Sequence, residues 1–146
     1  VPRAMCRNES TNSWTYTTAA WREANGTTDV NILDFVRGVA EDSYSATLST
    51  SASNTVAGVY FAVAIGDGGL ALPFPPQAFS LVGCSVGGVA SCLTASLTSV
   101  SFAIGRIKLY WQEYSQAGIG VTTWNGDNGF EGTWGRINGM TGMTTG

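Results

Sequence analysis

The clearest structural pattern in the sequence is Gly105-Arg106-Ile107-Lys108-Leu109-Tyr110-Trp111. Its odd positions are small or apolar, whereas its even positions carry a charge or a phenol. Because successive side chains of a β-strand point to opposite faces, this period of two predicts a strand with one face in the core and one toward solvent. No other segment of the chain alternates as clearly.

Other segments of the chain repeat this period of two. Residues 59–65 are apolar on both faces, which is typical of a central strand. Short strands separated by turn signals predict an all-β fold, an antiparallel β-sandwich or jelly roll, in a single domain over residues 1–146. We expect residues 1–12 to be a flexible leader and 139–146 a flexible tail. The predicted core residues are Val59, Phe61, Val63, Ile65, Ile107, Leu109, Ile119 and Val121.

One segment, residues 29–41, has apolar residues at helical spacing. Ile32, Leu33 and Val36 share one face of such a helix, and polar residues lie opposite. Gly38 weakens a helix by about 1 kcal/mol relative to alanine. The spacing therefore favours one short helix near residues 29–41, with a strand as the alternative.

Composition excludes several classes of protein. The chain has no histidine, which excludes Ser-His-Asp and Cys-His mechanisms and removes the commonest metal ligand. Seven basic residues against ten acidic ones leave no footprint for nucleic acid. No apolar run approaches eighteen residues, so we expect no membrane insertion. The sequence predicts a protein that is not an enzyme, with no cofactor and no metal site.

The carboxylates offer one pair that fits catalysis. Glu113 and Glu131 both follow predicted core strands near aromatic residues, as the two carboxylates of a glycosidase could. Solvated charges at the ends of strands are the favoured interpretation of both.

Cysteines and sequons bear on the compartment. Cys84 and Cys92 flank a Gly-Gly pair that would fold the segment back on itself, so a disulfide between them and two buried free thiols are about equally supported. Cys6 stands outside this hairpin. Asn8 and Asn25 begin possible glycosylation sequons. Together these features favour an extracellular location or the surface of a particle.

The C-terminal aromatic residues are the remaining candidates for a binding site. Trp124, Phe130, Trp134 and Tyr114 lie near turns, where they could stack on sugar rings or contact a protein partner. Capping of the core is the alternative for each. Trp111 continues the inward face of its strand, so we assign it to the core.

Part of the sequence resembles a known family. Residues 58–61 (Gly-Val-Tyr-Phe), 109–112 (Leu-Tyr-Trp-Gln), 118–121 (Gly-Ile-Gly-Val) and 129–133 (Gly-Phe-Glu-Gly-Thr) resemble strands of the C1q/TNF-like trimeric heads. The resemblance implies a β-sandwich, and no functional residue is carried over from it.

These observations favour a non-enzymatic structural subunit of an extracellular or virion surface assembly, such as a filament or a capsid protrusion. Few charges and many Ser and Thr residues suit close packing between copies, because an unpaired buried charge is costly. The segment Thr11 to Trp21 is the one we expect to add to a neighbour's sheet, and pairing within its own sheet is the alternative. A carbohydrate- or receptor-binding module is the second functional hypothesis.

Overall fold

The computed structural model describes residues 3–8, 11–39, 43–67, 76–83, 86–99, 104–126 and 138–144. These residues form antiparallel strands, one short 3₁₀ turn and no α-helix, which confirms the predicted all-β sandwich. The elements are β1 (Arg3–Asn8), β2 (Ser13–Thr15), β3 (Arg22–Glu23), η1 (Ala24–Gly26), β4 (Ile32–Arg37), β5 (Tyr44–Asn54), β6 (Tyr60–Asp67), β7 (Pro76–Gly83), β8 (Ser91–Ser99), β9 (Gly105–Ser115), β10 (Thr122–Asn125) and β11 (Gly139–Thr144).

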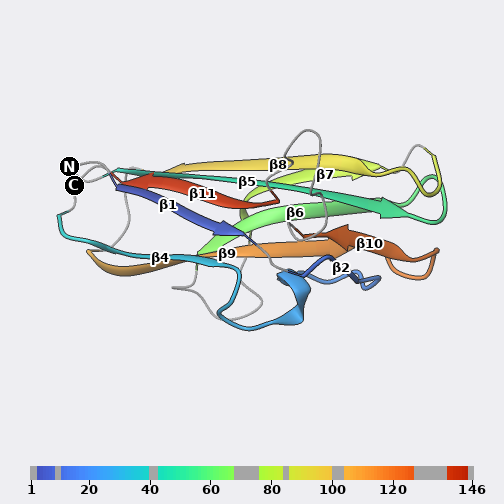
Figure 1. Ribbon diagram of the computed structural model, residues 1–146, viewed down its shortest axis with the longest axis horizontal. Helices are drawn as coiled ribbons and strands as arrows, with labels where there is room; N and C mark the ends of the chain where they lie inside the picture. Colours follow the sequence, from blue (N-terminus) through green and yellow to red (C-terminus); the bar gives the residue numbers. More distant parts are fainter. Residues whose placement is uncertain are drawn as a thin grey trace.

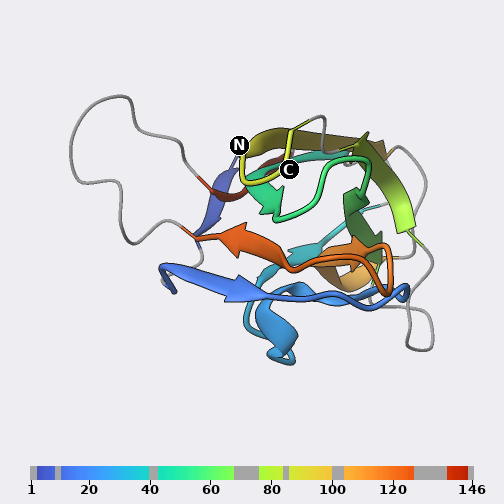
Figure 2. The same cartoon turned by 90° about the vertical axis from the view of Figure 1, so that its right-hand side faces the viewer.

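Two sheets enclose one core. In sheet A, β5 pairs with β8 along one side and with β11 and then β10 along the other. Strand β1 pairs with the outer edge of β11, and β2 pairs with the outer edge of β10. In sheet B, β9 pairs with β6 on one side and with β4 and β3 on the other, and β7 extends β6. The long strands run along the molecule, with both chain ends at one end and the turns before β6, β8 and β10 at the other (Figures 1 and 2).

Residues 105–111, whose alternation is the clearest in the sequence, form most of β9 at the centre of sheet B. This alternation is confirmed, because Ile107, Leu109 and Trp111 are buried between the sheets and Arg106 is exposed. From β6, Phe61 and its inward neighbours are fully buried in the same core. The other large core side chains are Trp14, Leu33, Tyr44, Leu48, Leu93, Trp124 and Met140.

The helix expected near residues 29–41 is wrong, and β4 stands in its place. The pairing of β4 with β9 joins Leu33 to Leu109, and it buries Leu33 while leaving Val36 74% exposed. Apolar residues at adjacent positions satisfy a helical spacing and a strand equally, and the partner strand β9 decides between them. The strand was the alternative at the sequence level.

Two predicted core residues are also corrected. Ile119 and Val121 lie exposed in the turn before β10, and Thr122 and Trp124 face the interior instead. A shift of one residue moves every side chain of a strand to the other face. The Thr122 hydroxyl is buried beside that of Ser115, at 2.6 Å, so a polar residue takes the inward position that the apolar pattern gave to Val121.

Half of the expected flexible leader and most of the expected flexible tail form strands. Residues 3–8 pair with residues 139–144 as β1 and β11, and β11 in turn pairs with β5. Met140 on β11 is fully buried, and Met5 on β1 packs against the core. These two methionines hold the paired strands in place, although the Gly and Thr composition of β11 predicts little order.

Candidate functional site

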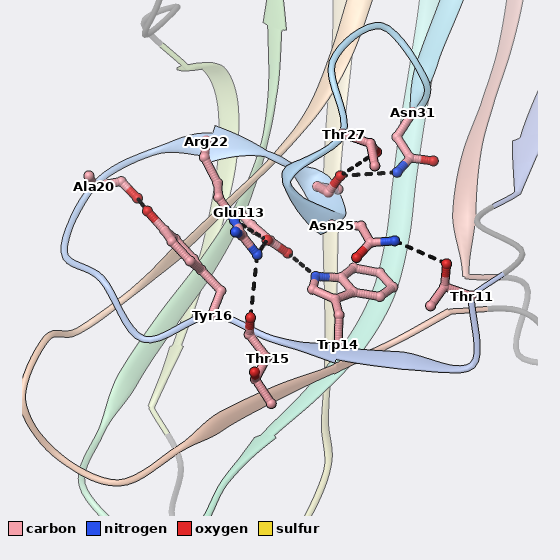
Figure 3. A network of polar contacts seen from close by, with 11 residues as sticks. Thr11, Trp14, Thr15, Tyr16, Ala20, Arg22, Asn25, Thr27, Asn31 and Glu113 are labelled. Carbon is pink, nitrogen blue, oxygen red and sulfur yellow. Dashed lines mark hydrogen bonds and ion pairs between the residues drawn. The ribbon is translucent and has the colours of Figure 1, made fainter.

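Glu113 on β9 lies at the centre of a buried polar network (Figure 3). The alternation of the strand turns its side chain inward, where it is fully buried. The Trp14 indole Nε1 donates to Oε2 at 2.6 Å, and the Arg22 Nε donates to Oε1 at 2.6 Å. Both donors belong to the N-terminal arm, defined here as residues 11–31, so this carboxylate joins the arm to sheet B.

The arm is braced at several further points. Tyr16 stacks under the Arg22 guanidinium, with 3.8 Å between the Arg22 Cζ and the ring centre, and its hydroxyl donates to the Ala20 carbonyl at 2.8 Å. The Trp14 ring meets that of Trp111 edge-on, with 5.9 Å between ring centres. The arm therefore packs into the core as well as bonding to it.

Burial sets the protonation of Glu113. Loss of water raises the pKa of its carboxyl to about 7, and the hydrogen bond from Trp14 and the charge of Arg22 limit the rise. Near neutral pH the group is therefore divided between its charged and neutral forms. Glu113 has no exposed surface, and its carboxylate holds the arm against sheet B through the Trp14 and Arg22 donors.

A second set of carboxylates fastens the far end of the arm. The Asp29 carboxylate accepts bonds from Lys108 Nζ at 2.9 Å and from the Tyr110 hydroxyl at 2.7 Å, and these bonds lower its pKa. The Asp29 backbone N–H donates to Glu23 at 2.8 Å, while burial raises the Glu23 pKa. No group of three potential metal-ligating side chains occurs among the residues that the structure describes.

The outward side of sheet A carries a different chemistry. Its strands present small hydroxyl side chains in register, such as Ser96, Thr47 and Thr141 side by side on β8, β5 and β11. The Thr47 and Ser96 oxygens lie 3.3 Å apart. We call this surface the hydroxyl face; its Ser and Thr residues are Ser13, Thr15, Ser45, Thr47, Ser49, Ser51, Ser53, Thr94, Ser96, Thr98, Thr123 and Thr141. None of the described side chains on this face is charged.

The outward side of sheet B is charged by contrast. Asp34 on β4 forms a two-pronged ion pair with Arg106 on β9, with 2.9 Å between Arg106 Nε and Oδ1. Lys108, two residues along β9, pairs with Asp29. The two faces of the sandwich therefore differ in the cost of covering them, since a charged group that loses water needs a partner.

The predicted contact residues have different positions. Trp124 is fully buried, with its ring edge-on to Phe61 at 5.9 Å, so its prediction as a surface contact is corrected. Tyr114 is half-buried on the outward side of β9, beside Trp21 at 5.4 Å. Phe130 and Trp134 lie outside the described residues, and their contact role stays a prediction.

The modification sites stay predictions. Cys92 lies exposed on β8, and its proposed partner Cys84 lies outside the described residues, so the disulfide stays a prediction. Asn8 ends β1, and Asn25 lies in η1, where its amide donates to the Thr11 hydroxyl at 3.0 Å. Cys6 lies exposed on the hydroxyl face.

Sequence reasoning missed the role of Glu113. It favoured a solvated strand-end charge, whereas the side chain is buried; Glu131, its proposed catalytic partner, lies outside the described residues. The available signal was the alternation itself, because position 113 continues the inward series 107, 109 and 111. Arg22 and Trp14 could not be connected to it from spacing, since they are 91 and 99 residues away.

Comparisons with known proteins identify a fold. No protein-family model matches the chain, and no curated protein matches its sequence. Among solved structures, a chain of infectious bursal disease virus (Gt strain) is similar at a TM-score of 0.52 and 13% identity, over 98% of this chain and 33% of the viral one. This chain therefore spans about a third of the viral chain, and at this identity the likeness concerns the fold alone.

Two further structures have lower scores. The globular domain of zebrafish complement 1qA protein matches at a TM-score of 0.41 and 10% identity, over 98% of this chain and 92% of that one. The latent PorU of Porphyromonas gingivalis matches at 0.48 and 9%, over 99% of this chain and 12% of that one.

Proposed function

We propose that this chain is a non-enzymatic structural module of a particle or extracellular surface, and that its copies contact one another through the hydroxyl face of sheet A. The observation that carries the proposal is the absence of charge among the described side chains of that face, against the ion pairs on the opposite sheet. Small uncharged side chains can be covered without the several kcal/mol that an unpaired buried ion costs.

The geometry of the hydroxyl face suits contact between identical surfaces. Side chains such as Thr47 and Ser96 are short, so two sheets can approach closely, and each hydroxyl can donate and accept a hydrogen bond. A two-fold arrangement of copies would place the same rows of hydroxyls opposite each other. The likeness of fold to a chain of a virus is in keeping with this role.

A charge placed at the centre of the face tests the proposal. Thr47 lies between Ser96 and Thr141, so Thr47→Arg would bury an unpaired cation in any contact between copies. We expect the wild-type chain to form dimers or larger assemblies in light scattering and electron microscopy, and T47R to be monomeric. Val36→Arg, on the exposed side of sheet B, is the matched control and should assemble as the wild type does.

The opposite results would overturn the proposal. A wild-type chain that stays monomeric at its highest soluble concentration has no such contact, and a T47R chain that still assembles uses another surface. Binding of soluble glycans by the wild type, measured by calorimetry, would favour the carbohydrate-binding hypothesis instead. That hypothesis rests on Trp124, Phe130, Trp134 and Tyr114. Of the two that the structure describes, Tyr114 has exposed surface and Trp124 is buried.

A further inference from the structure

Exposed aliphatic side chains gather at the end of the sandwich opposite the chain ends. Val56, Val86, Val89, Ile119 and Val121 have exposed fractions between 41% and 56%, and all lie in the turns before β6, β8 and β10. Figure 2 views this end directly. Scattered exposed apolar residues are ordinary, whereas a cluster of them marks a contact surface. We call residues 55–58, 86–90 and 117–121 the apolar tip.

The apolar tip contains no charged residue and is rich in glycine. Four of its glycines, Gly58, Gly88, Gly118 and Gly120, have positive φ angles of 81°, 78°, 84° and 65°. A side chain at Gly120 would collide with the Asn54 amide, because an added Cβ would lie 2.4 Å from its oxygen. The turn before β10 therefore packs closely against Asn54.

Hydrogen bonds to Asn54 and Thr55 connect all three turns. The Asn54 carbonyl accepts from the Gly88 N–H at 2.7 Å, and its side-chain oxygen accepts from the Val56 N–H at 2.8 Å. The Thr55 N–H donates to the Val121 carbonyl at 3.1 Å, and the Val121 N–H donates to the Thr55 hydroxyl at 3.0 Å. Backbone groups that are satisfied within the protein can enter an apolar medium at low cost.

Aromatic residues stand beside the tip on the outward side of sheet B. Tyr60 begins β6 with its ring exposed, and its backbone exchanges hydrogen bonds with Gln116, at 2.9 and 3.2 Å. On the same side of the sheet, Tyr114 of β9 lies beside Trp21, with 5.4 Å between ring centres and 44° between the ring planes. Aliphatic residues at a tip with Tyr and Trp behind them match the two depths of a lipid bilayer, its hydrocarbon and its headgroup region.

We propose that the apolar tip docks on the surface of a lipid bilayer with uncharged headgroups, inserting its Val and Ile side chains. The absence of Lys and Arg from the tip, and the acidic net charge of −3, argue against an anionic surface. The proposal revises the expectation of no membrane insertion, because folding joins three short apolar turns that no linear window contains.

Flotation with phosphatidylcholine vesicles tests the proposal. The wild-type chain should float with the vesicles, the bound fraction should not increase with added phosphatidylserine, and high salt should not release it. The double variant Val86→Asp, Val89→Asp should lose at least tenfold in binding. Val36→Asp, an exposed valine on β4 far from the tip, is the matched control and should bind as the wild type does.

A gain of binding separates docking from a structural role. Val89→Leu adds one methylene to an exposed side chain and should strengthen binding about fourfold. Failure of the wild type to float, an equal loss in V36D, or unchanged binding in V89L would overturn the proposal. So would tip variants that change the oligomeric state instead. T47R, the variant of the hydroxyl face, should still float, so this outcome is independent of the proposed assembly.

Discussion

The two halves of the interior are built on the same long strands from different chemistry. Toward the chain ends the core is mainly aliphatic, and we call it the aliphatic half; it contains Leu33, Leu48, Ile107, Leu109 and Met140. Toward the apolar tip it consists of large rings around a carboxylate, and we call it the aromatic half; it contains Trp14, Phe61, Trp111, Trp124 and Glu113.

The two halves differ in how specific their contacts are. Aliphatic side chains pack by shape and volume and accept many apolar partners. The aliphatic half therefore makes the two sheets pack together, but it does not determine which segment of the chain covers them. A buried carboxylate requires particular donors in particular places. Only the N-terminal arm provides Trp14 and Arg22, so the aromatic half determines where the arm lies.

Removal of the carboxylate should have the largest effect. Glu113→Ala leaves the guanidinium of Arg22 and the indole N–H of Trp14 without their acceptor, and we expect a loss of about 3–5 kcal/mol in the free energy of unfolding. Ile107→Val in the aliphatic half is the control, with an expected cost of about 0.5–1.5 kcal/mol. Urea denaturation measures both, and equal losses would abolish the distinction between the halves.

The pH dependence of stability should carry the signature of Glu113. Because burial raises its folded pKa to about 7, above an unfolded value near 4.5, the folded state binds this proton more tightly. Its contribution is therefore complete below about pH 4.5 and is lost as pH rises through 7, a decrease of about 3 kcal/mol. The raised pKa of Glu23 acts in the same direction, whereas the lowered pKa values of Asp29 and Asp34 act only in acid.

Glu113→Gln provides the control for this dependence. Glutamine keeps the size of the side chain and cannot titrate, so the decline in unfolding free energy between pH 5 and 8 should flatten. Thermal unfolding followed by circular dichroism across that range measures the slope. A slope as steep in E113Q as in the wild type would place the titration elsewhere, with Glu23 as the next group to replace.

The sequence predicts the two central strands of sheet B, which run through both halves, far better than the polar centre of the aromatic half. The alternation in residues 105–111 and 59–65 locates β9 and β6 correctly, because each apolar residue there needs only some apolar neighbour. Glu113 could not be placed in the same way, since its burial depends on Arg22, 91 residues away. The same reason explains β10, because its register is set by pairing with β5, where Thr122 lies opposite Asn54, 68 residues away, and its hydroxyl accepts from the Asn54 amide at 2.8 Å.

The ion pair on the outside of sheet B should have the smallest effect. Asp34 and Arg106 form a two-pronged pair, and the Arg106 side chain is 67% exposed. Water and salt screen such a pair, and ordering two long side chains offsets most of its Coulomb energy. Asp34→Asn should therefore unfold at the same urea concentration as the wild type, within the error of the measurement, in low and high salt alike. A clear destabilisation in D34N that disappears in high salt would mean that charge stabilises sheet B from outside, whereas ionisation of the buried Glu113 destabilises the fold from within.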